Sequence, residues 1–269
     1  MNMRSVGGSE RAGIAARIIT HLHASAREAR VADVRIGLGY TAVMLADERL
    51  GVAYTFREEA SGCCSVFDAL RPLVGRAASD VLHLLESPDP IAAGVGLACA
   101  NALVNRDEER LMDGDILDHL DLRSEDHVGM VGNFGPLVDK IQKRVRSLTV
   151  FERVAHPSGI VRPKEEAEDA LPRCHVALIT ATSIINHTID RLLQAASGCR
   201  EVAVLGASTP LLPEAFAEEQ VTMLSGVVVK NPQEVLRVVS EGGGMQLFSP
   251  HVRKVSMRAS ARLTSEVDN

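Results

Sequence analysis

The stretch that decides the fold is VALITATSIIN at residues 176–186, an apolar run followed at once by small and hydroxylated residues. The same design recurs at 128–136, VGMVGNFGP, and at 202–210, VAVLGASTP. Further apolar runs lie at 148–151 and 221–224, and helical stretches separate most of the five: 137–145, 185–196, 213–219 and 232–241. Continuous apolar strands that alternate with helices are typical of a parallel sheet buried on both faces. We therefore predict a doubly wound α/β unit over residues 128–269.

The preceding half of the chain has a different pattern. Ile14, Ile18 and Leu22 recur at a helical period within residues 12–28. Three short β-prone runs then predict an antiparallel meander, and three helical stretches follow. The predicted strands are 34–39, 42–46 and 51–56, and the predicted helices are 66–74, 78–85 and 91–104. The sequence thus predicts an α+β unit over residues 1–106.

The charge of the chain is concentrated between these two units. Residues 107–127 contain nine acids and only two cations, Arg110 and Arg123, so the net charge of this segment is −7. The whole chain has a net charge of −6, so the rest of the chain carries about +1. The two units are then close to neutral, and we interpret 107–127 as a solvated acidic connector. A nucleic-acid surface would need a basic face, and the 3% of aromatic residues leave little for base stacking. The composition argues against a nucleic-acid partner.

Export and membrane signals are absent from the sequence. The N-terminal residues contain no apolar leader, and the longest uncharged runs, 90–105 and 174–189, are short of a membrane span. Five cysteines without CxxC spacing fit a reducing compartment. We expect a cytoplasmic protein with no membrane partner that assembles as a homo-oligomer.

The candidate site lies beyond the carboxyl ends of the predicted strands, where open parallel sheets bind ligands. Neighbouring strands spaced at about 4.8 Å bring their loops within roughly 15 Å of one another. Small residues allow close backbone approach, and hydroxyls supply donors. The candidate ligand-binding residues in these loops are Gly132, Phe134, Pro136, Glu152, Thr180, Thr182, Ser183, Asn186, His187, Gly206, Ser208 and Thr209.

The first of these loops resembles a dinucleotide site but departs from it. Its glycines at 129, 132 and 135 do not form GxGxxG, and Pro136 removes an N–H donor at the helix start. Glu152 does follow Gly132 by twenty residues, where an acid would grip a ribose. The alternative is that the glycines form plain turns and that Glu152 caps a helix or faces solvent.

Several motifs together resemble the heavy-metal-chelation domain family. They are VGNFGPL at 131–137, VFER at 150–153, TATSIINHT at 180–188, LGASTPLLP at 205–213 and, upstream, GLACANAL at 96–103. The resemblance implies an enolase-N-terminal-like α+β domain, then a Rossmann-like domain, with a pocket between them and a role in metal handling. The sequence departs from the family at Ala181 and His187, where Gly is usual, and at Ala207, where Pro is usual.

Direct binding of a soft metal ion would require thiolates or imidazoles. The loops that carry the candidate ligand-binding residues contain no Cys, so the candidate metal ligands are Cys63 and Cys64 together with His187. Packing or a helix-start turn is the alternative role for the two adjacent cysteines. Cys99 is expected in the core, and the remaining two cysteines precede strands, at the opposite edge of the sheet.

Two classes of function stay open. One is a protein that binds or handles a metal ion or metal chelate in a pocket between the units. The other is an enzyme that uses the same cleft on a polar, phosphorylated or nucleotide-like small molecule, although a nucleotide is the less favoured ligand. Asn101, on an otherwise apolar helix, either satisfies backbone groups in the core or reaches this cleft. A purely structural partner protein is disfavoured by the clustered loop motifs, and no catalytic residue is assigned.

Overall fold

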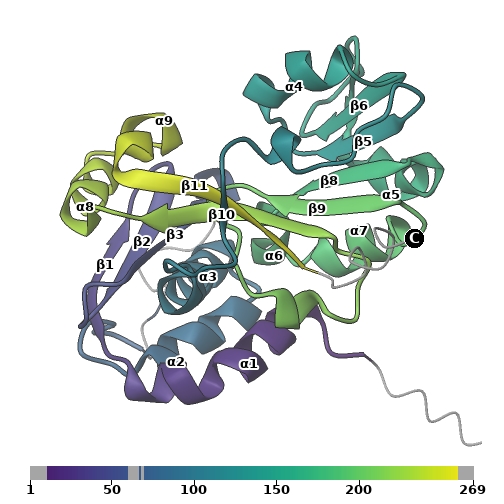
Figure 1. Ribbon diagram of the computed structural model, residues 1–269. Helices are drawn as coiled ribbons and strands as arrows, with labels where there is room; N and C mark the ends of the chain where they lie inside the picture. The colour runs from purple at the N-terminus through teal and green to yellow at the C-terminus, as the bar shows by residue number, and fades with distance from the viewer. Residues whose placement is uncertain (1–10, 60–66, 68–69, 260–269) are drawn as a thin grey trace, which may run out of the picture.

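The computed structural model describes residues 11–59, 67 and 70–259, and its first unit is a three-stranded sheet with helices packed on one side (Figure 1). The strands pair in chain order as an antiparallel meander. They are β1 (Val31–Ile36), β2 (Tyr40–Leu45) and β3 (Leu50–Tyr54). Helix α3 (Pro90–Val104) packs on β2 and β3, and α1 (Ile14–Glu28) and α2 (Ala78–Leu82) pack against α3. The predicted meander is confirmed.

Helix α3 begins and packs as its sequence dictates. The carboxylate of Asp89 accepts hydrogen bonds from the N–H groups of Ile91, at 2.8 Å, and Ala92, at 3.0 Å. Pro90 occupies the first turn, where no N–H is needed. A Cβ on Gly51 of β3 would lie 2.2 Å from the carbonyl oxygen of Ala98, so only glycine allows this close contact between strand and helix.

The second unit is an eight-stranded, mostly parallel sheet in the order β4-β11-β10-β9-β8-β5-β6-β7. All pairs from β10 to β7 are parallel, and β11 and β4 are added antiparallel at one edge. The strands are β4 (Met112–Asp113), β5 (His127–Val131), β6 (Ser147–Glu152), β7 (Val161–Pro163), β8 (Val176–Thr180), β9 (Glu201–Leu205), β10 (Met223–Val229) and β11 (Val252–Arg258). The five predicted strands are five of these eight, and the predicted α/β class is confirmed.

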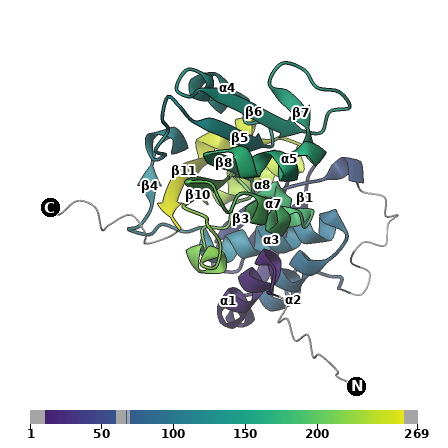
Figure 2. The same ribbon diagram turned by 90° about the vertical axis from the view of Figure 1, so that its right-hand side faces the viewer.

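Both faces of this sheet are covered, which explains the continuous apolar runs. In Figure 2, α4 (Gly135–Gln142) lies on one side of β5 and β6, and α7 (Ile189–Ala195) lies on the other. Met130 and Leu178 belong to one hydrophobic cluster, whereas the adjacent Ile179 and Val204 belong to the other. Alternate side chains of a strand point to opposite faces, so an apolar residue is needed at every position.

The acidic connector differs from the prediction. Residues 107–127 are not a solvated linker, because Met112–Asp113 forms β4 and the side chains of Ile116, Leu117 and Leu120 are buried against the sheet. These three apolar residues stand among acids in the sequence, so the high charge of the segment favoured a solvated linker over a buried one. Several of those acids pair with cations of the sheet unit, as in the 2.5 Å contact between Lys140 and Asp115.

One acid of this segment is fully buried. Asp126 accepts hydrogen bonds from the guanidinium of Arg200, at 2.7 and 3.1 Å, and from the N–H of Arg123, at 2.8 Å. Burial alone would raise the pKa of the Asp126 carboxyl, but these hydrogen bonds and the Arg200 charge hold the pKa below its ordinary value. The pairing fixes the segment on the strand-start edge of the sheet.

The helices show three further differences from the prediction. The expected helix at 185–196 is broken into α6 (Thr182–Ile185) and α7, and the expected helix at 213–219 is a short 3-10 turn, Pro213–Phe216. Of the expected helix at 66–74, residues 70–74 are not helical and positions 66, 68 and 69 lie outside the described residues. The other helices of this unit are α5 (Ala167–Ala170), α8 (Pro232–Ser240) and α9 (Met245–Phe248).

The two units share one core. Helix α8 of the second unit packs on β1 and β2 of the first (Figure 1). Its Val235 and Val239 join Ala42 and Val52 in one buried cluster. The meander and the parallel sheet are therefore held at a fixed angle to each other.

Candidate functional site

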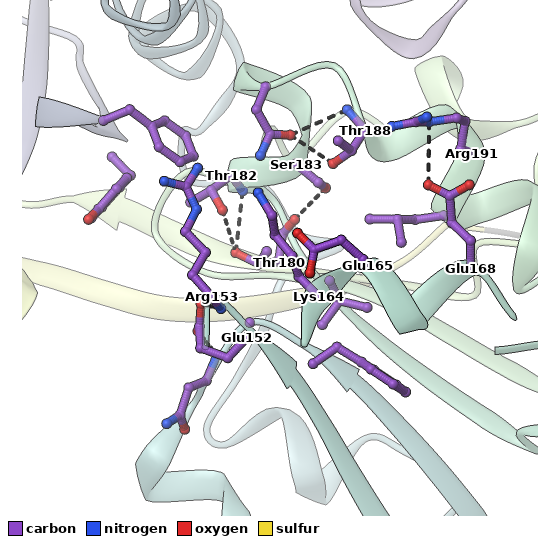
Figure 3. Close-up of a pocket in the computed structure, with 18 of the residues that line it drawn as sticks. Glu152, Arg153, Lys164, Glu165, Glu168, Thr180, Thr182, Ser183, Thr188 and Arg191 are labelled. Atoms are coloured by element: carbon purple, nitrogen blue, oxygen red, sulfur yellow. Dashed lines mark hydrogen bonds and ion pairs between the residues drawn. The ribbon is translucent and has the colours of Figure 1, made fainter. Parts of the chain in front are cut away.

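A cavity of about 770 Å³ lies where the carboxyl ends of β5, β6, β7 and β8 face the end of β3. Both units contribute to its wall. Figure 3 shows labelled side chains around it: Glu152 and Thr180 lie at strand ends, whereas Glu168 and Arg191 come from α5 and α7. The lining residues are Tyr54, Phe56, Arg57, Glu58, Val131, Gly132, Asn133, Phe134, Phe151, Glu152, Arg153, Lys164, Glu165, Glu168, Asp169, Thr180, Thr182, Ser183, Asn186, Thr188, Arg191 and Leu192.

The predicted site residues separate into two groups. Seven of them line this cavity: Gly132, Phe134, Glu152, Thr180, Thr182, Ser183 and Asn186. The others lie elsewhere. Pro136 is exposed in the first turn of α4, Gly206 lies behind the Phe134 ring, and Ser208, Thr209 and Asn101 are buried between the units. His187 borders a second, smaller cavity. Cys63 and Cys64 lie outside the described residues.

The turn after β8 is held by its own hydroxyl groups. The hydroxyls of Thr180 and Thr182 are 3.0 Å apart, and Ser183 donates its hydroxyl to the carbonyl of Thr180 at 2.5 Å. Asn186 accepts from both the N–H and the hydroxyl of Thr188 through its Oδ1 atom. These bonds orient the side chains before any ligand arrives, which lowers the entropic cost of binding.

Glu152 bridges two loops at the cavity wall. One carboxylate oxygen accepts from the N–H of Asn133 at 2.9 Å, and the other accepts from the N–H of Arg153 at 2.8 Å. Gly132 precedes this contact with φ +89°, and a Cβ there would lie 2.9 Å from the Thr180 side chain. The loop therefore needs glycine at 132, and Glu152 occupies an N–H that a phosphate would use in a dinucleotide loop.

Charged side chains that the sequence did not single out form much of the wall. Lys164 reaches the cavity from the end of β7, and Figure 3 shows it pointing inward with Arg153. Arg191 of α7 pairs with Glu168 of α5 at 3.4 Å. Arg153 could have been found from its position, because it directly follows Glu152 at the end of a predicted strand. Lys164 could not, because β7 before it is only three residues long and contains an arginine and a proline, so no apolar run predicts a strand there.

The joint beside the cavity is built on two asparagines one turn apart: Asn101 of α3, and Asn105, which caps the C-terminal end of that helix. Asn101 donates from Nδ2 to the carbonyls of Val52, at 2.8 Å, and Ser208, at 3.1 Å. Of the two alternatives for this residue, the structure has the one in which it satisfies buried backbone groups. Asn105 donates to the carbonyls of Thr209 and Val227, at 2.9 and 3.2 Å.

The same joint is closed from the sheet side. Asn105 accepts from the N–H of Leu211 at 2.8 Å, and Ser208 accepts through its hydroxyl from the N–H of Tyr54 at 2.9 Å. Tyr54 lines the cavity, so the hydroxyl of Ser208 positions the cavity wall although it lies outside the lining. The loop after β9 is therefore a structural joint between the units.

His187 makes a second contact between the units. Its Nε2 atom lies 2.8 Å from the carbonyl oxygen of Ser87, and its backbone has φ +55°. This left-handed conformation favours glycine and ends α6 before α7 begins. The cavity beside it, of about 320 Å³, is bordered by Glu86, Asp190 and Gly13 among others.

A family model described as "Putative heavy-metal chelation" matches residues 115–258, and a second model with the same description matches residues 19–104. The chain belongs to this family. An uncharacterised protein of Methanocaldococcus jannaschii is 24% identical over 251 residues, which cover 90% of this chain and 95% of that one.

Two solved structures of family members share the fold. Both are proteins of unknown function from the DUF364 family and are 22% identical to this chain. The one from Desulfitobacterium hafniense has a TM-score of 0.79 and covers 91% of this chain and 96% of its own. The one from Pyrococcus horikoshii has a TM-score of 0.81 and covers 91% and 99%. At this identity the likeness establishes the fold alone.

Membership of the heavy-metal-chelation family raises the question of whether the residues present could hold a metal ion directly. The described lining of the large cavity has carboxylates but neither His nor Cys. Across the described residues, no group of three or more His, Cys, Asp or Glu side chains is arranged to hold a metal ion. This donor set does not fit a soft metal ion bound by these side chains alone.

The described thiols do not change this result. Burial raises the pKa of both the Cys99 and the Cys199 thiol to about 12, and it raises the pKa of Cys174 as well. None of these three thiols lines the cavity, and burial disfavours the thiolate form that a metal ion binds. All three side chains pack as small hydrophobic groups.

In the described part of the chain, no helix has the length and apolar character needed to cross a membrane.

Proposed function

We propose that the chain binds a small polar metal chelate, that is, a metal ion already held by an organic chelator, in the cavity between its two units. The observation that carries this proposal is the donor set of the cavity. Its described lining offers hydroxyls, two amides, carboxylates and cations, but neither imidazole nor thiol. Such groups recognise the organic shell of a chelate, whereas a bare soft metal ion would call for thiolate or imidazole ligands.

The size and order of the cavity support the same proposal. A volume of about 770 Å³ is within the range of small-molecule sites, and it exceeds what a single ion needs. The Thr180–Thr182 pair and the Glu152 bridge are already ordered by internal hydrogen bonds. Asn101 holds Val52 of β3, and the Ser208 hydroxyl holds the N–H of Tyr54, so the wall that the first unit contributes is fixed.

The alternative, an enzyme acting on a phosphorylated or nucleotide-like molecule, has weaker support. The Glu152 carboxylate takes the N–H of Asn133 and places negative charge where a phosphate would lie. Arg153 and Lys164 nonetheless offer positive charge at the cavity, so an anionic substrate group remains compatible with it. A nucleotide is therefore the comparison ligand in the test.

The test is calorimetric titration of the full chain with cobalt(II) iminodiacetate, with free cobalt(II) and with ATP. We expect the chelate to bind at one site per chain and more tightly than the free ion. A chelate at 100 times its dissociation constant adds about 2.7 kcal/mol to stability, which raises Tm by roughly 5–10 °C. Tighter binding of free cobalt(II) or of ATP would contradict the proposal.

Matched variants locate the site. Thr182→Val removes a cavity hydroxyl while keeping the branched shape, and Thr149→Val makes the same change in β6 outside the lining. We expect the first variant to weaken chelate binding by about 5- to 10-fold, the value of one hydrogen bond of about 1–1.4 kcal/mol. The second variant should bind like the unaltered protein. Equal effects of both variants would place the site elsewhere.

A further inference from the structure

Aromatic side chains are scarce in this chain, and half of them gather at the cavity. The sequence has six Phe, two Tyr and no Trp. Four of these eight rings line the cavity: Tyr54, Phe56, Phe134 and Phe151. They come from both units, because β3 and the residues after it supply the first two, and the β5–α4 loop and β6 supply the others. A cavity that bound only polar groups would not need this concentration of rings.

The rings differ in how far they reach the cavity space. Tyr54 is 37% exposed and Phe134 is partly exposed, whereas Phe151 is 1% exposed and belongs to the core behind the cavity wall. Tyr54 meets Phe56 edge to face, with ring centroids 5.1 Å apart and an interplanar angle of 86°. Tyr54 and Phe134 therefore offer ring surface to a ligand, and the other two support them.

Positive charge lies beside these rings. The guanidinium of Arg153 stacks over the Phe56 ring, 5.1 Å from its centroid, as in a cation–π pair. The amino group of Lys164 makes no ion pair within the described ranges, although five acids line the same cavity. Figure 3 shows both side chains pointing into the cavity from the ends of β6 and β7. Ring faces and cations thus border the same space.

We infer that the ligand of this cavity is a flat conjugated acid, a planar aromatic or heteroaromatic ring system that carries carboxylates. The inference rests on the proposed function, since it describes the organic part of the chelate. The ring would lie against Tyr54 and Phe134, because aromatic faces and edges pair favourably. The carboxylates would meet Lys164 and the guanidinium held on Phe56, because charged hydrogen bonds to carboxylates are the strong ones.

The test compares two acids with the same donor atoms. Dipicolinate is a planar pyridine with two carboxylates, and iminodiacetate is its flexible aliphatic counterpart with one nitrogen and two carboxylates. Each is titrated calorimetrically, without metal, into the full chain. We expect dipicolinate to bind at least about 10-fold more tightly. Equal affinities, or tighter binding of iminodiacetate, would overturn the inference.

Variants of the cavity residues complete the test. Tyr54 is partly exposed, so replacing it should change ligand binding without preventing the chain from folding. Tyr54→Leu removes a ring, and we expect it to weaken dipicolinate about 3- to 10-fold, the value of an aromatic pair, while iminodiacetate changes less than 2-fold. Tyr54→Phe keeps the ring and should therefore keep the preference for dipicolinate over iminodiacetate. Lys164→Gln should weaken both acids alike. A Tyr54→Leu variant that retains the full preference for dipicolinate would refute the role of the rings.

The two proposals fail in different ways. If cobalt(II) iminodiacetate binds but the planar acid has no advantage, the ring inference is overturned and the chelate proposal stands. If neither acid binds while cobalt(II) iminodiacetate does, the inference is again overturned. If no acid and no chelate binds, both proposals are overturned.

Discussion

Asn105→Ala is expected to loosen the joint between the two units. The side chain of Asn105 is 8% exposed and makes three hydrogen bonds to backbone groups that are themselves buried. Each such bond contributes about 1 kcal/mol, and stranded partners add to the loss, so the variant should lose about 3 kcal/mol. For a chain of this size that loss lowers Tm by roughly 6–12 °C.

Differential scanning calorimetry at neutral pH measures this change. The control is Gln142→Ala, which removes an exposed amide side chain at the end of α4, away from the joint. The control should melt within about 1 °C of the unaltered protein. A shift of less than 2 °C for Asn105→Ala would refute the argument that these three bonds hold the units together.

Four further predictions follow from particular contacts. Glu152→Gln keeps one oxygen that accepts a backbone N–H and loses the other, so Tm should fall by about 2–4 °C. An unchanged Tm would mean that the carboxylate does not bridge the N–H groups of Asn133 and Arg153. At the left-handed position of His187, the Gly variant should be more stable than the Ala variant by about 1 kcal/mol in urea unfolding, and the reverse order would contradict the backbone assignment. The lowered pKa of Asp126 contributes stability that is present above its unfolded pKa, near 3.9, and is lost as pH falls through the lower folded pKa. Asp126→Asn should therefore be less stable at pH 7 but lose less stability on acidification below about pH 4, and parallel pH profiles would count against this. The joint replacement of Cys63 and Cys64 by Ser should leave most cobalt(II) iminodiacetate binding intact in calorimetry, and abolished binding would show that these thiols hold the metal.

The sheet could be predicted because its cause is local in the sequence. A strand buried on both faces needs an apolar residue at every position, as at 128–131 and 176–180. A buried helix such as α3 has similar runs, so the short length of each run and the turn residues after it are what indicate a strand. The short strand β7 escaped prediction for the opposite reason. Val161, Arg162 and Pro163 are all partly exposed at the sheet edge, so no apolar run marks them. Missing this strand also meant missing Lys164 at its end.

Helix limits depend on contacts that the sequence does not reveal. The apolar period across 185–196 fits one helix, but His187 adopts a left-handed conformation, and its Nε2 atom donates to the carbonyl oxygen of Ser87, 100 residues away. The strand predicted at 221–224 is β10, Met223–Val229, which pairs with β11 along its whole length. Contacts with residues far along the chain therefore set where this helix and this strand begin and end, and local sequence preference does not reveal them.

The candidate site divides in the same way. Residues that directly follow a strand, such as Gly132, Glu152 and Thr182, could be placed at one sheet edge because parallel strands end together. The role of Ser208 could not, since it depends on the N–H of Tyr54 from the other unit. The grouping of scarce rings also depends on how the two units meet, which no periodicity in the sequence encodes.

Anomalous diffraction from crystals soaked with cobalt(II) iminodiacetate tests the central claim most directly. The proposed function predicts one cobalt peak per chain within the cavity, near Thr182 and Lys164, with the chelator between the metal and the protein. A peak bound directly by imidazole or thiol side chains away from this cavity, or none at saturating chelate, would contradict the account.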